Sequence, residues 1–129
     1  MADNLAVVLA AAGTGSRMES EINKQYMLLK GRPVICYSLD LFDRLGMVKE
    51  VIIVAHPGEV EYCESQIVAK YGYSKISRVV AGGITRQHSV WYGLNQVDKA
   101  TDLVAVHDGA RPLVDEDMFM DVAAAAREW

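Results

Sequence analysis

The sequence predicts a Rossmann-like, doubly wound α/β fold, with a mainly parallel sheet and helices on both of its faces. The first observation is a set of four short apolar runs, three of them rich in Val and Ile: Leu5–Ala10, Val51–Ala55, Ile76–Ala81 and Leu103–Val106. None alternates strictly with polar residues, which is typical of parallel strands buried on both faces. The second observation is that segments of helical period follow these runs. Alternating strands and helices favour a doubly wound sheet with right-handed crossovers.

The helical segments follow the four runs in order: 33–45, 58–71, 85–97 and 115–129. The first opens with a proline, which the first turn of a helix tolerates. The third carries Trp91 and Tyr92, and we expect at least one of them to lie in the core. The last opens with acidic residues, which stabilise a helix N-terminus. It ends at Trp129 in an alanine-rich helical pattern without a stop signal, which predicts a truncated domain; a frayed terminal helix is the alternative.

Length, charge and cysteine content narrow the class of protein. A chain of 129 residues, 51% of them hydrophobic, indicates a single globular domain. The net charge of −4 argues against a general binder of nucleic acid or anionic membranes. Cys36 and Cys63 lack metal-ligand spacing and are expected to be free, buried thiols. The N-terminus lacks the basic region of a signal peptide, so we expect a cytoplasmic protein.

The loop after the first run has the composition of a phosphate cradle. Residues 10–18 read Ala-Ala-Ala-Gly-Thr-Gly-Ser-Arg-Met, with Lys24 further on. Glycines leave amide groups exposed, and successive exposed N–H groups bind anions. Arg17 adds a planar cation suited to phosphate. The alternative is a glycine-rich turn with solvated cations. The loop is not a P-loop, because no Gly-Lys-Ser/Thr follows, and Met18 replaces the third glycine of the dinucleotide fingerprint.

The loop after the third run begins with Gly82 and Gly83, which leave the backbone open to a flat ligand. Arg86 and Ser89 then fall near the start of the next helix, where anions and polar ligand groups are favoured. Thr85 is the expected N-cap of that helix. An ordinary strand-to-helix turn is the alternative interpretation.

The loop after the fourth run places Asp108 directly after a buried strand, followed by Gly109 and Arg111. A carboxylate there, facing a phosphate cradle, is suited to Mg²⁺, which prefers oxygen ligands. The alternative is that Asp108 caps a turn while Arg111 is solvated. His107 is expected to be a packed residue at a strand end rather than a base, and the two other histidines, His56 and His88, are given structural roles too.

With these loops in order, the chain resembles the 2-C-methyl-D-erythritol 4-phosphate cytidylyltransferase family of the nucleotidyltransferase superfamily. The matching stretches are LAAAGTGSRM at 9–18, KQY at 24–26, GGITRQHSV at 82–90 and VHDGARP at 106–112. The family chain is longer, so residues 1–129 would be the CTP-binding part of a single nucleotidyltransferase domain whose C-terminal portion is absent. His88 and Ile84 depart from acidic residues that family members often have there, and neither change removes an expected catalytic group.

The resemblance implies transfer of CMP from CTP to 2-C-methyl-D-erythritol 4-phosphate, with release of pyrophosphate, in isoprenoid precursor synthesis by the non-mevalonate pathway. Arg17 and Lys24 would be catalytic, stabilising charge on the reacting phosphorus. Asp108 would bind Mg²⁺, or another divalent cation, and would help Gly109 and Arg111 to hold the acceptor. The implied nucleotide-binding residues are Ala11, Ala12, Gly13, Thr14, Gly15, Arg17, Lys24, Gly82, Gly83, Arg86 and Ser89.

The implied partners are CTP and a polyol phosphate, with a homodimer for the full-length protein and with neither nucleic acid nor membrane. Two alternatives stay close to this reading: a ribitol-5-phosphate cytidylyltransferase, and a fragment that binds CTP without turnover. A plain α/β domain or a dinucleotide-binding fold is the remaining alternative, and the missing third glycine argues against the latter.

Overall fold

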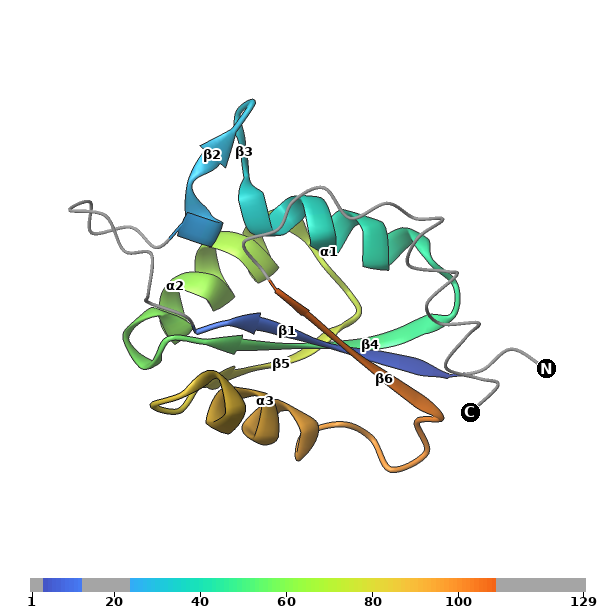
Figure 1. Cartoon of the computed structure of the whole chain (residues 1–129). Coiled ribbons are helices and arrows are strands. Elements are labelled where there is room, and N and C mark those ends of the chain that lie inside the picture. The colour runs from blue at the N-terminus through green and yellow to red at the C-terminus, as the bar shows by residue number, and fades with distance from the viewer. Residues whose placement is uncertain (1–3, 13–23, 109–129) are drawn as a thin grey trace.

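Figure 1 shows the computed structural model, which describes residues 4–12 and 24–108. At Lys24 and Asp108 it describes the backbone alone. The expected helix over 115–129 therefore lies outside the described residues. No helix among the described residues is long and apolar enough to cross a membrane.

The centre of the fold is a four-stranded parallel sheet in the order β5-β4-β1-β6. Its strands are β1 (Leu5–Ala11), β4 (Val48–Ala55), β5 (Ile76–Ala81) and β6 (Leu103–Asp108). These are the four apolar runs, extended by a few residues, and the parallel sheet expected from their continuous hydrophobicity is confirmed. The first strand of the chain is central because β4 and β6 both pair with it.

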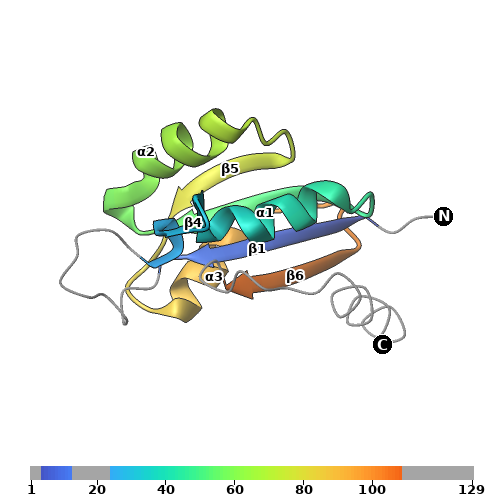
Figure 2. The same cartoon turned by 90° about the horizontal axis from the view of Figure 1, so that it is seen from above.

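Helices cover both faces of this sheet, as the doubly wound prediction requires. On one face lie α1 (Val34–Arg44) and α2 (Val60–Cys63), the latter continuing as the π-helical turn η3 (Glu64–Ala69); α3 (Arg86–Leu94) lies on the other face (Figures 1 and 2). A short 3₁₀ turn, η2 (Pro57–Glu59), precedes α2. The helix expected over 58–71 is thus one continuous coil of three helical types.

A small hairpin stands apart from the sheet and was not predicted. It consists of β2 (Leu28–Leu29) and β3 (Arg32–Pro33), and a 3₁₀ turn, η1 (Lys24–Tyr26), precedes it. Its turn residues, Lys30 and Gly31, have φ values of 53° and 80°. Positive φ at both central residues is the requirement of a two-residue hairpin turn whose twist matches the strands.

The core is divided by the sheet into two unequal clusters. The larger lies under α1 and α2 and includes Val7, Leu9 and Phe42. The smaller lies under α3 and consists of Val8, Ile52 and Val54, since successive side chains on a strand point to opposite faces. Both clusters contain side chains of β1 and β4, so packing on both faces holds these two strands in the middle of the molecule. The site described below lies at their carboxyl ends.

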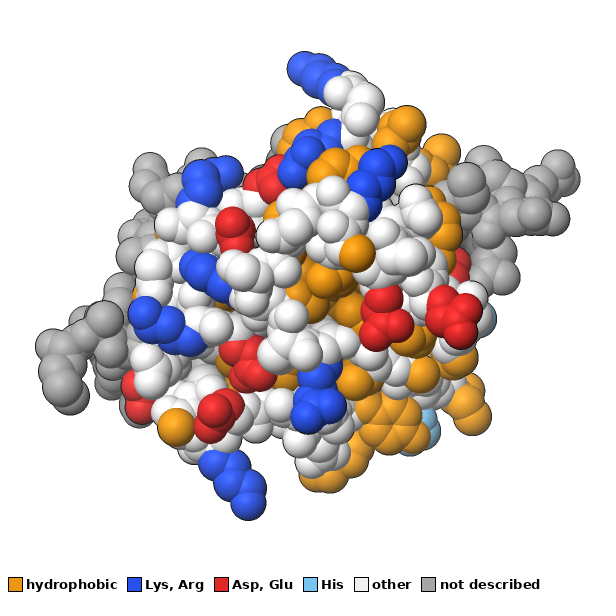
Figure 3. All heavy atoms as spheres, turned by 180° about the vertical axis from the view of Figure 1, so that it is seen from behind, with side chains coloured by type: hydrophobic (Ala, Val, Ile, Leu, Met, Phe, Trp, Pro, Cys, Tyr) orange, Lys and Arg blue, Asp and Glu red, His pale blue; other side chains and the backbone are white. Residues whose placement is uncertain are grey.

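The helix α3 approaches the sheet closely through Gly93. A Cβ atom built on Gly93 would lie 2.5 Å from Val8 Cγ1 and 2.8 Å from Val54 Cγ2. Because the small residues face the sheet, Trp91 and Tyr92 point outward and are 60% and 45% exposed. The expectation that one of them would be core is wrong. Figure 3 shows the hydrophobic side chains that gather at the surface near α3, at the lower right of the view.

Candidate functional site

The carboxyl ends of the four parallel strands meet at one edge of the sheet, where ligands of open α/β sheets bind. A hollow of about 310 Å³ opens there. Its lining comes from the ends of three neighbouring strands, β1, β4 and β5: Ala12, His56, Pro57, Gly82, Gly83 and Ile84. The structure thus brings together the first and second loops that the sequence singled out.

Gly82 allows the first two loops to touch. A Cβ atom at this position would lie 2.5 Å from Ala12 Cβ and 2.6 Å from Ser89 Oγ, closer than real Cβ contacts come. The Gly82 backbone N–H donates to the carbonyl of Ala55 at 2.7 Å, which ties the end of β5 to the end of β4. Any larger residue here would push the loops apart.

Ser89 and Thr85 hold the second loop in shape. Ser89 is only 3% exposed, and its Oγ accepts a hydrogen bond from the Gly83 N–H at 3.1 Å. Thr85 caps α3 as expected, because its Oγ1 accepts from the His88 N–H at 3.1 Å. The Gly83 N–H already donates to Ser89, so a ligand beside Gly83 would form its hydrogen bond with the carbonyl and not with the N–H.

Gln25 is a site residue that we did not single out from the sequence. Its side chain is 3% exposed, and its Nε2 donates to the backbone carbonyl of Ala11. This bond joins η1 to the end of β1, and therefore brings the backbone of Lys24 near Ala11. The available signal was its place in the Lys-Gln-Tyr stretch.

The third loop begins beside the first. Asp108 is the last residue of β6 and is opposite Ala10 in the register of β1. The preceding His107 packs as expected for a strand-end residue: its Nε2 lies 3.0 Å from Ser38 Oγ, and its ring meets Phe42 edge-on at 5.6 Å. Helix α1 thus anchors the end of β6.

The contacts described above do not include seven of the predicted site residues. Arg86 is the exposed first residue of α3. Six others lie outside the described residues: Gly13, Thr14, Gly15, Arg17, Gly109 and Arg111. Among the described side chains no group of three or more His, Cys, Asp or Glu could hold a metal ion, and the Asp108 carboxyl is not among those described. The Mg²⁺ site therefore stays a prediction.

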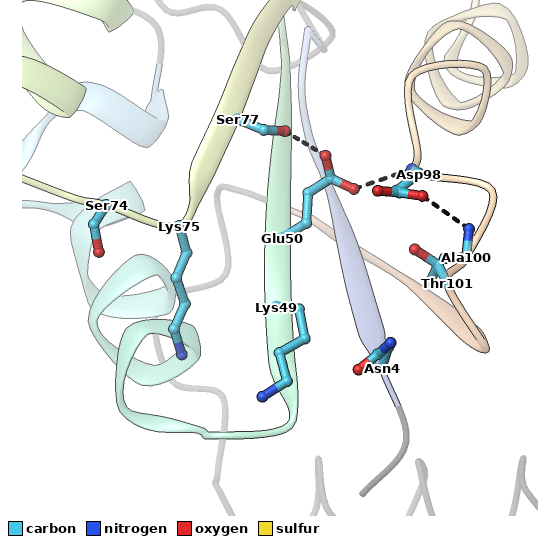
Figure 4. A pocket seen from close by; sticks show the side chains of 9 residues that line it. All are labelled: Asn4, Lys49, Glu50, Ser74, Lys75, Ser77, Asp98, Ala100 and Thr101. Carbon is cyan, nitrogen blue, oxygen red and sulfur yellow. Dashed lines mark hydrogen bonds between the residues drawn. The ribbon is translucent and has the colours of Figure 1, made fainter.

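A second hollow, of about 300 Å³, lies at the opposite end of the strands (Figure 4). Here Glu50 accepts hydrogen bonds from Ser77 Oγ at 2.6 Å and from the Asp98 N–H at 3.2 Å. Lys75 Nζ donates to the carbonyls of Leu45 and Phe42, at the end of α1. These charged groups are occupied in closing the fold, so this hollow is not our candidate site.

A third hollow, of about 430 Å³, lies between the hairpin and α2 and includes Tyr26, Tyr62 and Gln66 in its lining. The Tyr26 and Tyr62 rings meet there edge-on at 5.1 Å. Burial beside the Cys63 thiol raises the pKa of the Tyr26 hydroxyl. This hollow is larger than the other two but lies away from the strand ends, so its size does not make it the candidate site.

A doubly wound sheet whose carboxyl edge ends in alanine and glycine loops defines the class: an α/β domain of the nucleotide-binding type. The family model of 2-C-methyl-D-erythritol 4-phosphate cytidylyltransferase matches residues 5–129. The chain belongs to this family.

Individual relatives and structures agree. The 2-C-methyl-D-erythritol 4-phosphate cytidylyltransferase of Caldanaerobacter subterraneus subsp. tengcongensis is 42% identical over 123 residues, which are 95% of this chain and 54% of that protein. The protein of the same name from Clostridium acetobutylicum is 46% identical over 112 residues, 87% of this chain and 48% of its own. The chain spans about half the length of these curated relatives.

Among solved structures, the 4-diphosphocytidyl-2C-methyl-D-erythritol synthase of Anaerococcus prevotii superposes with a TM-score of 0.80 at 32% identity, over 98% of this chain and 52% of that one. The bifunctional IspDF of Campylobacter jejuni gives a TM-score of 0.77 at 21% identity, over 98% of this chain and 31% of that one, and supports the fold alone.

Proposed function

We propose that this chain supplies the CTP-binding part of an enzyme that transfers CMP from CTP to 2-C-methyl-D-erythritol 4-phosphate and releases pyrophosphate. Family membership supports the reaction. The observation that carries the assignment is the contact between the first two loops at the carboxyl edge, where Gly82 touches both Ala12 and Ser89. The relatives reported above bear the name of this transferase, so we do not propose the ribitol-5-phosphate enzyme.

In the proposed reaction a phosphate oxygen of the acceptor attacks the α-phosphorus of CTP, and the bond to pyrophosphate breaks. No protein nucleophile is needed, because a phosphate dianion is itself a competent attacker. Catalysis is then positioning together with stabilisation of charge on the five-coordinate phosphorus. We assign that stabilisation to Arg17 and Lys24. Arg86 would add positive potential at the nucleotide, and Gly109 and Arg111 would help place the acceptor.

We assign Asp108 as the residue that holds Mg²⁺. The fit rests on chemistry and position: a carboxylate is the oxygen ligand that Mg²⁺ prefers, and the Asp108 backbone lies opposite Ala10, two residues before Ala12, where the proposed phosphate loop begins. When bound there, the ion would offset the negative charge of the triphosphate.

We further infer a cytoplasmic protein that forms a homodimer at the family's full length. The buried, free Cys36 and Cys63 support a reducing compartment, since thiols in oxidising compartments tend to pair. Gel filtration of a family-length version would test the dimer, and a monomeric elution would contradict it.

The first test is calorimetry of CTP with this chain, with and without Mg²⁺. Separate titrations with ATP and NAD measure whether the chain selects CTP. We expect CTP-selective binding that Mg²⁺ strengthens. Equal binding of ATP and CTP, or preference for NAD, would contradict the proposal and favour a different α/β nucleotide binder. Circular dichroism on the same sample confirms that the chain is folded.

The second test is pyrophosphate release from CTP and 2-C-methyl-D-erythritol 4-phosphate by a family-length version. We expect Lys24→Ala to reduce turnover more strongly than it reduces CTP affinity, because the proposed role of Lys24 is in the transition state. An unchanged rate in Lys24→Ala would contradict the catalytic role, and no release from the unaltered protein would contradict the reaction.

A further inference from the structure

The strand order forces one residue beneath any ligand at the candidate site. In the order β5-β4-β1, strand β4 lies between the two strands whose loops we assign to CTP. A ligand that contacts both Ala12 after β1 and Gly82–Gly83 after β5 must therefore lie over the carboxyl end of β4. The residue directly after β4 is His56, which lines the same hollow.

His56 has distinctive chemistry in this position. Among the described residues that line the hollow, it alone carries a polar side chain; its neighbours there are alanine, proline, isoleucine and glycine. It is half-buried, at the start of η2. No other described side chain that lines the hollow can therefore donate a hydrogen bond to a ligand.

The hydrogen bonding of the His56 ring determines which nitrogen can donate. Its Nδ1 accepts a hydrogen bond from the Gly58 backbone N–H at 3.1 Å. A neutral imidazole carries one proton, so a ring that accepts at Nδ1 carries its proton on Nε2. The bond to Gly58 thus leaves the Nε2–H as a donor of fixed tautomer, available to a ligand.

We propose that the His56 Nε2–H donates to a ring acceptor of the cytosine base, O2 or N3, and so helps to select and orient the nucleotide. This assignment rests on the proposed function, in which CTP occupies the carboxyl edge. The triphosphate is assigned to the loop at 12–17, so the flat base is the part that lies between Ala12 and the paired glycines. The sequence suggested a structural role for His56, and this proposal gives it a role in nucleotide specificity.

Two substitutions separate donation to the base from support of the turn. In His56→Asn the side-chain oxygen occupies the place of Nδ1 and can still accept from Gly58, but no donor remains at the ε position. In His56→Gln the amide nitrogen lies near the place of Nε2 and can donate, while the turn loses its acceptor. Lys49→Gln, at the opposite end of the sheet, is the control.

Calorimetry with CTP and Mg²⁺ on this chain gives the result. We expect roughly three- to tenfold weaker binding in His56→Asn, as for loss of one net hydrogen bond, a smaller loss in His56→Gln, and none in Lys49→Gln. All three should melt as the unaltered chain does, within a few degrees. Equal affinity of His56→Asn and the unaltered chain would overturn the inference alone. Loss in His56→Gln but not in His56→Asn would also overturn it, and would indicate a role in the turn.

The ribose is the other source of an acceptor, and a nucleotide analogue distinguishes it. If the contact is to the base, His56→Asn weakens 2′,3′-dideoxy-CTP by the same factor as CTP. If the loss disappears with that analogue, the partner is a ribose hydroxyl and the assignment to the base is overturned. Absence of CTP binding by the unaltered chain would overturn the proposed function, and this inference with it.

Discussion

The two ends of the sheet carry hollows of nearly equal volume, about 300 Å³ at the amino end and about 310 Å³ at the carboxyl end. At the amino end, charged side chains bind the protein's own backbone and hydroxyl groups, as Glu50 and Lys75 do. At the carboxyl end, alanine and glycine line the space, with His56 as the one polar side chain among the described lining residues. Volume does not distinguish the two hollows; what their polar groups already bind does.

The difference has a physical origin. Polar groups in the amino-end hollow bind one another and the backbone, although Asn4, Ser77 and Asp98 are exposed. For example, the Asn4 N–H donates to the Asp102 carboxylate at 3.0 Å, and the Asn4 carbonyl accepts from two backbone N–H groups. At the carboxyl end, side chains are reduced to a minimum, so a ligand can approach the backbone. One end stabilises the fold, and the other is open to a ligand.

The largest effect is expected when a side chain fills the hollow at the carboxyl end. Gly82→Val would place new atoms within about 2.6 Å of Ala12 and Ser89. We expect CTP affinity to fall by more than about tenfold, and the free energy of unfolding to fall by about 1–3 kcal/mol from overpacking. Calorimetry and urea denaturation measure the two effects.

Gly46→Ala is the matched control, because a Cβ atom there meets nothing within 4 Å and its φ is not positive. It should bind CTP as the unaltered chain does. Normal CTP binding by Gly82→Val would show that the first two loops need not touch, and would contradict the site.

The next largest effect is expected at Gln25. In Gln25→Ala the buried Ala11 carbonyl loses its partner, which costs about 1–3 kcal/mol in the free energy of unfolding. We also expect weaker CTP binding, because Lys24 is no longer held beside β1. Gln66→Ala, exposed on η3, is the control. A stability loss without any loss of affinity would limit Gln25 to the fold.

A smaller effect, on stability and not on CTP binding, is expected at the amino end. Lys75→Met keeps the apolar stem but removes the ammonium that caps the carbonyls of Leu45 and Phe42. We expect a loss of about 1 kcal/mol in the free energy of unfolding and unchanged CTP binding. A large drop in CTP affinity would remove the distinction between the two ends.

A further effect concerns the core between the two ends, where the buried Cys63 thiol makes the free energy of unfolding depend on pH. Burial raises the pKa of the Cys63 thiol from 9.0 to about 12. The unfolded thiol ionises first, so the stability that this group contributes is complete below pH 9.0 and is lost as the pH rises toward about 12. Unfolding measured from pH 8 to pH 11 should show the decline, and Cys63→Ala should reduce it.

Thiol labelling provides the corresponding check at one pH. At pH 8 a disulfide reagent should leave the buried Cys36 and Cys63 unmodified in the folded chain and label both in guanidinium. Rapid labelling of the folded chain would contradict the burial.

The strands were predictable because each is a continuous apolar run, and a parallel sheet covered on both faces requires that pattern. The hairpin was not, because Leu28–Leu29 is exposed and too short to show a period. Lys30 and Gly31 form its turn, but the turn is recognised by their positive φ values and not by their sequence. Trp91 was misplaced because helical spacing does not say that Gly93 would face the sheet.

The candidate site divides along the same line. The place of Gly82 and Gly83 at the hollow, and of Asp108 at the end of β6, could be predicted because local composition at the end of an apolar run marks them. His56 and Gln25 could not, because their importance comes from neighbours distant in sequence. His56 matters only once β4 is known to lie between β1 and β5, and Gln25 only once its amide reaches the Ala11 carbonyl.

The central place of β1 has a consequence for synthesis of the chain. Of the described strands β1 is synthesised first, yet its neighbour β6 is made almost a hundred residues later, and the bond from Asn4 to Asp102 spans 98 positions. Until then one edge of the most apolar strand has no partner, and contacts so distant in sequence form slowly. The nascent chain therefore depends on its last described strand to protect its first.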